Sequence, residues 1–146
     1  VVLGAGVIGC EFATIFSAFG KTKVYLIDKA DRILPFEDED IADVVKHNLE
    51  AHGAMVHQGA SLKRMEIVAG KVEYELEYKN GKTEVLRVDK ALISIGRVPN
   101  IEGIGLENAG VKMNDRGCVW DDDTQTNISN IYVAGDVTTE VALVNV

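Results

Sequence analysis

The sequence predicts an α/β fold in which a parallel sheet carries an additional antiparallel meander of three strands. From residue 1 to residue 57, short apolar runs alternate with stretches of helical apolar spacing, in the order β-α-β-α-β. Helical connections of this kind join parallel strands through right-handed crossovers. Between residues 62 and 88, three strand-like runs are separated only by turn residues, which indicates antiparallel hairpins.

The first two elements are a strand and a helix joined by a glycine-rich turn. The apolar run 1–3 ends in the turn 4–6, and apolar residues then recur at helical spacing through 7–19. Gly20 follows, and glycine is the residue type most often found just past a helix end. We therefore expect strand, turn and helix within the first 20 residues.

A second strand, a second helix and a third strand follow. Residues 23–28 are largely β-prone, and this strand ends in an acidic residue. The acidic run 37–40 is typical of a helix start, where carboxylates complement the positive end of the dipole. The helix is expected to stop at Gly53, before a strand at 54–57. Its predicted buried face consists of Ile41, Val44, Val45 and Leu49.

The meander is predicted from the runs 62–68, 71–78 and 83–88. In the middle run apolar and charged residues alternate, so one face is predicted to be buried and the other solvated. Ala69-Gly70 joins the first two runs, and Asn80-Gly81, a strong signal for a type I′ turn, joins the last two. The apolar run 91–95 is then expected to return to the parallel sheet.

A domain boundary is predicted at residues 96 and 97, because the character of the sequence changes there. The stretch beyond it is rich in loop residues and leads to one more apolar strand at 131–134, followed by a turn at Gly135 and Asp136. The prediction is therefore two parts, 1–96 and 97–146. Because residue 1 already belongs to an apolar strand, we expect the chain to be part of a longer protein.

Composition and charge exclude several classes of protein. With 15 basic and 23 acidic side chains the formal charge is −8, which disfavours binding to nucleic acid or anionic membranes. The sequence contains no apolar stretch of about 18 residues. Cys10 and Cys118 lie far apart and form no metal-binding pattern, which favours a reducing compartment. We expect a cytoplasmic protein with neither a membrane nor a nucleic-acid partner.

Gly4, Gly6 and Gly9 form a G-x-G-x-x-G pattern directly after a strand and at the start of a helix. In that setting the first glycine permits a tight turn, the second lets the backbone approach a pyrophosphate, and the third lets the helix pack on the strand. The free N–H groups of the helix that begins near Val7 would bind the anion. The alternative is a glycine turn that binds no ligand.

Asp28 lies 19 residues after Gly9, at the predicted end of the second strand, where a carboxylate can accept hydrogen bonds from an adenosine ribose. The same carboxylate repels a 2′-phosphate, so NAD is predicted in preference to NADP. NADP remains the alternative, because Lys29 and Arg32 follow Asp28 and a cation there could favour NADP. A further alternative is that Asp28 only ends the strand.

The sequence contains no nucleophile–base arrangement and no metal-ligand spacing. His47, His52 and His57 come from one helix and its exit, and they are predicted to be surface or capping residues. Hydride transfer would therefore require a bound cofactor, because no side-chain pattern supplies redox chemistry. No catalytic residue and no metal site is predicted in the chain.

Four segments follow one another along the chain: GAGVIGCEFA at 4–13, DRILP at 31–35, IGRVPN at 95–100 and TNISNIYVAGD at 126–136. Their content and order resemble the motifs of the flavin-dependent pyridine nucleotide–disulfide oxidoreductases. The resemblance implies that residues 1–96 are a Rossmann-like NAD-binding domain and that residues 97–146 are an incomplete segment of an FAD-binding domain. An upstream FAD-binding domain and a downstream dimerisation domain would complete the protein, a homodimer.

The resemblance also implies roles for individual residues. It puts Glu11 near the nicotinamide and the flavin, Asp136 on the flavin ribityl chain, and Gly96 and Arg97 at a junction beside the cofactors. The residues predicted to bind NAD or FAD are Gly4, Gly6, Val7, Ile8, Gly9, Glu11, Asp28, Lys29, Gly96, Arg97 and Asp136.

The activity implied by the resemblance is hydride transfer between NAD(H) and flavin, coupled to a redox disulfide. A transhydrogenase acting between NAD and NADP is the alternative within the family, and a non-catalytic NAD-binding module is the alternative outside it. The family's redox cysteine pair belongs to an upstream domain, so neither Cys10 nor Cys118 matches it. The 146 residues alone are expected to bind NAD weakly and to catalyse no reaction.

Overall fold

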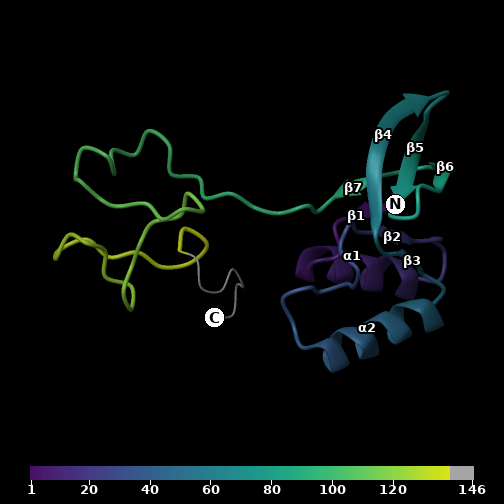
Figure 1. The fold of residues 1–146 in the computed structure, drawn as a ribbon, viewed down its shortest axis with the longest axis horizontal. Coiled ribbons are helices and arrows are strands. Elements are labelled where there is room, and N and C mark those ends of the chain that lie inside the picture. The colour runs from purple at the N-terminus through teal and green to yellow at the C-terminus, as the bar shows by residue number, and fades with distance from the viewer. Residues whose placement is uncertain (139–146) are drawn as a thin grey trace. The chain divides into compact units, whose positions relative to one another are not determined.

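A four-stranded parallel sheet in the order β3-β2-β1-β7 forms the centre of the first part of the chain (Figure 1). The structure is a computed structural model, and it describes residues 1–138. The strands are β1 (Val2–Leu3), β2 (Tyr25–Ile27), β3 (Met55–His57) and β7 (Leu92–Ile93). β1 pairs in parallel with both β2 and β7, which confirms that the run at 91–95 returns to this sheet.

Two helices cover one face of the parallel sheet, α1 (Val7–Ala18) and α2 (Glu39–Ala51) (Figure 1). Cys10 and Ala13 of α1 pack with Val2 and Leu26 of the sheet in one buried cluster. The acidic start predicted for α2 is confirmed, because the Asp38 carboxylate caps the helix by accepting a hydrogen bond from the Asp40 N–H.

The buried face of α2 differs from the predicted one. Ala42 is buried, whereas Ile41 is 59% exposed and Val44 is 65% exposed. Consecutive residues are rotated by about 100° around a helix, so a stripe at positions 42, 45 and 49 turns residues 41 and 44 outward. The small side chain of Ala42 allows this face to lie close to the sheet.

The opposite face of the parallel sheet is covered by the meander, which consists of β4 (Ala60–Val68), β5 (Lys71–Tyr78) and β6 (Thr83–Val88). Tyr74 and Leu76 of β5 are fully buried and pack with Leu3 and Ile27 of the sheet. Because successive residues of a strand point to opposite faces, Leu3 meets the meander while Val2 meets the helices. The predicted α/β fold with an added meander is confirmed.

The type I′ geometry expected at Asn80-Gly81 is found instead at the other hairpin turn of the meander. Ala69 (φ 48°) and Gly70 (φ 76°) both have positive φ, as a type I′ turn requires. At the other hairpin only Gly81 has positive φ, and its N–H donates to the Tyr78 carbonyl at 2.8 Å. The type I′ prediction for Asn80-Gly81 is therefore wrong, because one more residue in that loop favours an ordinary turn followed by a left-handed glycine.

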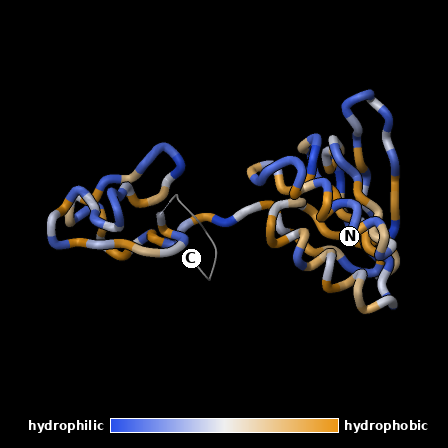
Figure 2. Tube along the Cα trace, turned by 90° about the horizontal axis from the view of Figure 1, so that it is seen from below, coloured by the Kyte–Doolittle hydropathy of each residue, from blue (hydrophilic) through white to orange (hydrophobic). Residues whose placement is uncertain are grey.

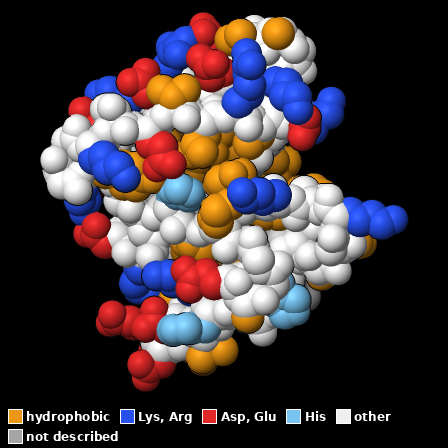
Figure 3. Space-filling model, turned by 90° about the vertical axis from the view of Figure 1, so that its right-hand side faces the viewer, with side chains coloured by type: hydrophobic (Ala, Val, Ile, Leu, Met, Phe, Trp, Pro, Cys, Tyr) orange, Lys and Arg blue, Asp and Glu red, His pale blue; other side chains and the backbone are white. Residues whose placement is uncertain are grey.

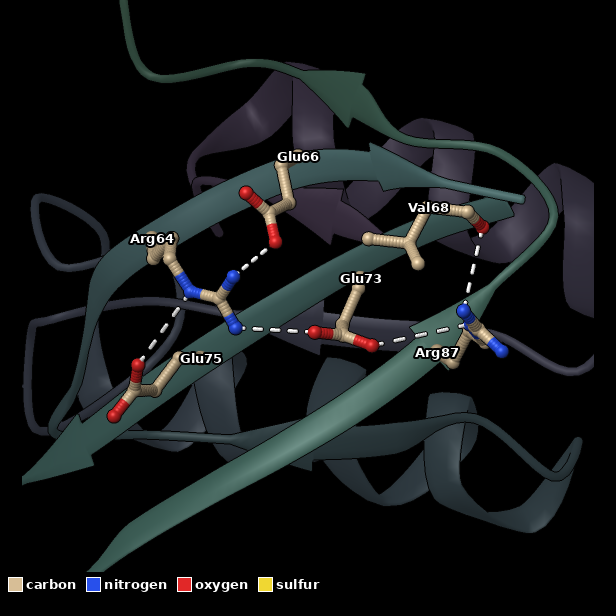
Figure 4. A network of polar contacts seen from close by, with 6 residues as sticks. All are labelled: Arg64, Glu66, Val68, Glu73, Glu75 and Arg87. Carbon is tan, nitrogen blue, oxygen red and sulfur yellow. Dashed lines mark hydrogen bonds and ion pairs between the residues drawn. The ribbon is translucent and has the colours of Figure 1, made fainter. Parts of the chain in front are cut away.

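The outer face of the meander carries interspersed charges, as the space-filling view shows (Figure 3). Arg64 lies among three carboxylates, those of Glu66, Glu73 and Glu75 (Figure 4). Arg87 contacts the second oxygen of Glu73, so this carboxylate joins the two arginines. Apolar residues gather instead where helices, sheet and meander meet (Figure 2).

The second part of the chain forms a separate compact unit that begins at Arg97, the first unit being Val1–Gly96. Between residues 97 and 138 it consists of turns and isolated bridges rather than regular strands. The strand predicted at 131–134 is wrong, because within residues 97–138 Tyr132 makes one isolated bridge, to Gln125, and no strand extends the ladder. Asn127 links two loops there by accepting from the Lys112 N–H and donating to the Gly110 carbonyl.

Within residues 1–138, neither helix is long and apolar enough to cross a membrane.

Candidate functional site

The turn between β1 and α1 is closely packed at its first and third glycines. Gly4 has a φ of +93°, and a Cβ added to it would lie 2.3 Å from the Ser94 carbonyl oxygen. A Cβ added to Gly9 would lie 1.8 Å from the Gly4 carbonyl oxygen. The turn and the contact between helix and strand therefore require residues without side chains at both positions.

The second glycine has the opposite environment. A Cβ added to Gly6 would have no heavy atom within 4 Å, so the space beside it is open. Gly6 is also the N-cap of α1, and no side chain of the described residues caps this helix. The first-turn N–H groups of Val7, Ile8 and Gly9 therefore stand at an open, electropositive helix end, which suits an anion such as a pyrophosphate.

Asp28, directly after β2, is fixed beside the glycine turn. Its Oδ2 accepts a hydrogen bond from the Ala5 N–H at 2.6 Å, and its Oδ1 accepts one from the Ala30 N–H at 2.8 Å. Each oxygen of an ionised carboxylate has room for a second donor. The half-buried Asp28 can therefore receive ribose hydroxyls while its orientation is held by the backbone.

The two cations near Asp28 differ in their availability. Lys29 is exposed. Arg32 donates hydrogen bonds to the backbone carbonyls of Leu34, Pro35 and Glu37 in its own loop.

Glu11 lies on the second turn of α1, where it is exposed and borders an open groove of about 610 Å³. The groove runs between α1, the loop at 34–37 and α2, and its lining residues include Leu34 and Glu37. Cys10 lies against the same helix face but is buried, and burial together with the Asp28 charge raises the pKa of its thiol to about 11. The thiol therefore stays protonated and poorly nucleophilic at neutral pH.

The remaining predicted residues lie at the junction and in the second unit. Gly96, with a φ of +138°, ends the first unit. Arg97 and Asp136 form an ion pair within the second unit. The sequence carries no local signal for this pair, because the two residues are separated by nearly 40 positions.

The sequence predicted no role for Ser94, which directly follows β7 and contacts the glycine turn. Its hydroxyl contacts the Leu3 carbonyl at 2.7 Å and the Gly4 carbonyl at 3.1 Å. A serine that follows a short apolar run is not distinctive in a sequence, and only the pairing of β7 with β1 places it there.

The prediction for the histidines is confirmed for His47, which is exposed on α2, and for His52, the exposed C-cap of that helix, and is wrong for His57. The His57 ring is partly buried between the sheet and the meander, with Nδ1 2.5 Å from the Tyr78 hydroxyl. That hydroxyl donates to Glu84 at 3.0 Å. Burial lowers the pKa of His57, although the Glu84 carboxylate raises it. The backbone places this group next to Asp28, whose N–H donates to the His57 carbonyl.

A strand, a glycine turn and a helix, followed by a strand that ends in a carboxylate, are the arrangement of the Rossmann-like class of α/β domains. The first unit has this arrangement. The chain belongs to the pyridine nucleotide-disulphide oxidoreductase family, whose sequence profile matches residues 1–146.

Relatives with established names agree with this family. The chain is 39% identical over 136 residues to dihydrolipoyl dehydrogenase of Bacillus subtilis, covering 93% of this chain and 29% of that protein. It is 40% identical over 138 residues to soluble pyridine nucleotide transhydrogenase of Pseudomonas paraeruginosa, covering 94% and 29%. The chain therefore spans less than a third of the length of these relatives.

A solved structure shares the fold. The copper complex of the flavoprotein disulfide reductase RclA from Escherichia coli superposes with a TM-score of 0.82 and 36% sequence identity. The superposition covers 97% of this chain and 31% of that one.

Proposed function

We propose that residues 1–96 bind NAD(H) and that the protein transfers hydride between NAD(H) and a flavin, coupled to a redox disulfide as in a dihydrolipoyl dehydrogenase. The observation that carries the proposal is the joint arrangement of Gly6 and Asp28. The open space at Gly6 leaves room for a pyrophosphate at the α1 N-terminus, and the Ala5 N–H holds Asp28 beside the same turn.

In this proposal the helix N-terminus, Asp28 and Glu11 each contact a different part of the dinucleotide. The N–H groups of Val7, Ile8 and Gly9 hold the pyrophosphate, and the Asp28 carboxylate accepts the adenosine ribose hydroxyls. Glu11, further along α1 and beside the open groove, is proposed to lie near the nicotinamide. The bound nicotinamide supplies the hydride chemistry, and the chain supplies binding and orientation.

The same geometry favours NAD over NADP. The Asp28 carboxylate would repel a 2′-phosphate, and the Arg32 guanidinium is engaged by three carbonyls of its own loop. Lys29 remains as an exposed cation next to Asp28. A single exposed ammonium contributes little against a fixed carboxylate at the same position.

The flavin part of the proposal rests on the family and on the second unit. Asp136 and Arg97, with Gly96 before them, are proposed to border the flavin, but they form only a small part of a site for FAD. The other FAD contacts, the redox cysteines and a dimerisation domain would come from parts of a homodimeric protein outside the chain. Alone, the chain is proposed to be inactive.

A second candidate is a soluble transhydrogenase, because the identity to the Pseudomonas relative is 40% and that to the Bacillus dehydrogenase is 39%. The two candidates differ in the group that exchanges electrons with the flavin besides NAD(H), which is a disulfide in one and NADP in the other. Assays of the intact protein with NADH and either lipoamide or an NADP analogue would separate them.

Calorimetric titration of the purified protein with NADH and then with NADPH tests the binding step. We expect NADH to bind more tightly than NADPH. Absorbance between 350 and 500 nm, read beforehand, reports any retained flavin. A protein that binds neither nucleotide would overturn the proposal, and one that binds NADH without any oxidoreductase activity in its intact form would be an NAD-binding module instead.

A further inference from the structure

The side chain of Arg32 organises the loop between β2 and α2. Its Nη1 donates to the Leu34 carbonyl at 3.2 Å, and its Nη2 donates to the carbonyls of Pro35 at 2.9 Å and Glu37 at 2.8 Å. The segment 32–37 is therefore folded around one guanidinium. A lysine cannot replace this arrangement, because an ammonium lacks the planar fork of N–H donors.

Leu34 is the residue of this loop that reaches the glycine turn. Its φ is +45°, a left-handed conformation that a leucine adopts only when its surroundings hold it there. The Leu34 N–H donates to the Ala5 carbonyl at 2.7 Å, and its carbonyl accepts from both Arg32 and the Glu37 N–H. The Leu34 side chain is 9% exposed and belongs to the same buried cluster as Ala5.

A continuous series of contacts therefore joins Arg32 to the proposed ribose carboxylate. Arg32 holds Leu34, Leu34 bonds to the carbonyl of Ala5, and the N–H of Ala5 bonds to Asp28. Ala5 is the residue between the first two glycines of the motif. A displaced Leu34 would thus change both the turn that faces the pyrophosphate and the partner of the carboxylate.

We propose that Arg32 is a positioning residue for the dinucleotide, which holds residues 32–37 against the glycine turn and thereby withdraws its own charge from a 2′-phosphate. The proposal rests on the NAD(H)-binding function inferred above. It assigns the preference for NAD to two groups: Asp28, which repels the phosphate, and Arg32, three of whose five N–H donors are bonded to backbone carbonyls of its own loop.

The test compares Arg32→Ala and Arg32→Lys with the wild type in the intact protein. Binding of NADH and of NADPH is measured by fluorescence titration, and hydrogen exchange is measured on the peptide that contains Leu34. We expect Arg32→Ala to weaken the binding of both nucleotides by about tenfold, comparable to the loss of one charge-assisted hydrogen bond. We also expect it to speed hydrogen exchange at Leu34. The control variant Lys21→Ala removes an exposed positive charge outside this loop, and it should change neither nucleotide binding nor hydrogen exchange at Leu34.

The Arg32→Lys variant keeps the positive charge but not the planar fork of donors, so it distinguishes a positioning role of Arg32 from a role of its charge alone. If Arg32 positions the loop, the lysine variant weakens NADH binding and speeds exchange at Leu34 as the alanine variant does. If the wild-type Arg32 serves instead as a phosphate ligand, Arg32→Ala loses NADPH binding while its NADH binding is unchanged, which would overturn the proposal. Unchanged exchange at Leu34 in both variants would overturn it as well. Should the wild type bind neither nucleotide, the proposed function fails, while the exchange reading still decides whether Arg32 holds the loop. Should Arg32→Ala not fold, Arg32→Lys carries the test.

Discussion

The backbone N–H of Ala5 donates to the Asp28 carboxylate across 2.6 Å, so the glycine turn and the end of β2 are joined directly. Ala5 lies between two glycines and has no side chain that could reach a ligand, yet it sets the orientation of the acidic residue. The turn for the pyrophosphate and the acceptor for the ribose are thus one preorganised unit, which reduces the ordering that binding would otherwise require.

Replacing Asp28 tests the selectivity of this unit. Asp28→Arg should weaken NADH binding and strengthen NADPH binding relative to it, because the change replaces a repelling carboxylate with a cation that can pair with a 2′-phosphate. Each tenfold change in either dissociation constant corresponds to about 1.4 kcal/mol. Titration of the variant with both nucleotides measures the ratio, and an unchanged ratio would show that Asp28 does not face the ribose.

Two glycines of the motif provide a matched pair of variants. Gly9→Ala puts a methyl group into a space where a Cβ lies 1.8 Å from the Gly4 carbonyl oxygen, so it should lower the free energy of unfolding by roughly 1–3 kcal/mol. Gly6→Ala adds the same methyl group in open space. It should leave the melting temperature nearly unchanged and weaken NADH binding by blocking the approach of the pyrophosphate.

Thermal denaturation and NADH titration of both variants read the two effects separately. Equal stability losses at positions 6 and 9 would contradict the packing seen at Gly9. Normal NADH binding by Gly6→Ala would contradict the placement of the pyrophosphate.

The lowered pKa of His57 predicts that the stability of the protein depends on pH. Burial lowers the pKa of its ring from the ordinary 6.5, with Glu84 acting in the opposite direction and Lys82 in the same direction as burial. The unfolded chain therefore binds a proton more readily than the folded one. The free energy of unfolding should fall as the pH drops below 6.5 and level off below the folded pKa.

Tyr25, Tyr78, Lys82 and Glu84 are the other titratable groups around this ring, and histidine is the side chain whose ordinary pKa lies between about pH 5 and pH 8. His57→Gln should therefore flatten the stability profile between roughly pH 5 and pH 7. Denaturant titrations at several pH values measure the profile. A variant that keeps the full slope would assign the effect to another group.

The ion pairs on the outer face of the meander should contribute little stability. Arg64 contacts Glu66, Glu73 and Glu75, but its side chain is 44% exposed, and water and salt screen such contacts. Arg64→Ala leaves three neighbouring carboxylates without this partner, so its destabilisation should be small and should depend on salt. Melting curves at low and high ionic strength test this, and a large loss that persists in high salt would contradict it.

Most of the elements could be predicted because each depends on neighbours in the sequence. The alternation along β5 predicts the buried Tyr74 and Leu76, and the acidic run before α2 predicts its capped start. The strand at 131–134 was predicted wrongly for the complementary reason. An apolar run becomes a strand only where a second strand is available for pairing, and Tyr132 has a single bridge to Gln125.

The sequence by itself determined the order of the elements, the glycine motif and the position of Asp28, because periodicity and motif spacing are local properties of the chain. Only the tertiary structure decided what those residues touch. The bond from Ala5 to Asp28, the contact of Ser94 with the glycine turn and the burial of His57 join residues between 21 and 90 positions apart. Such contacts depend on how strands, helices and meander pack, and no local pattern in the sequence records that packing.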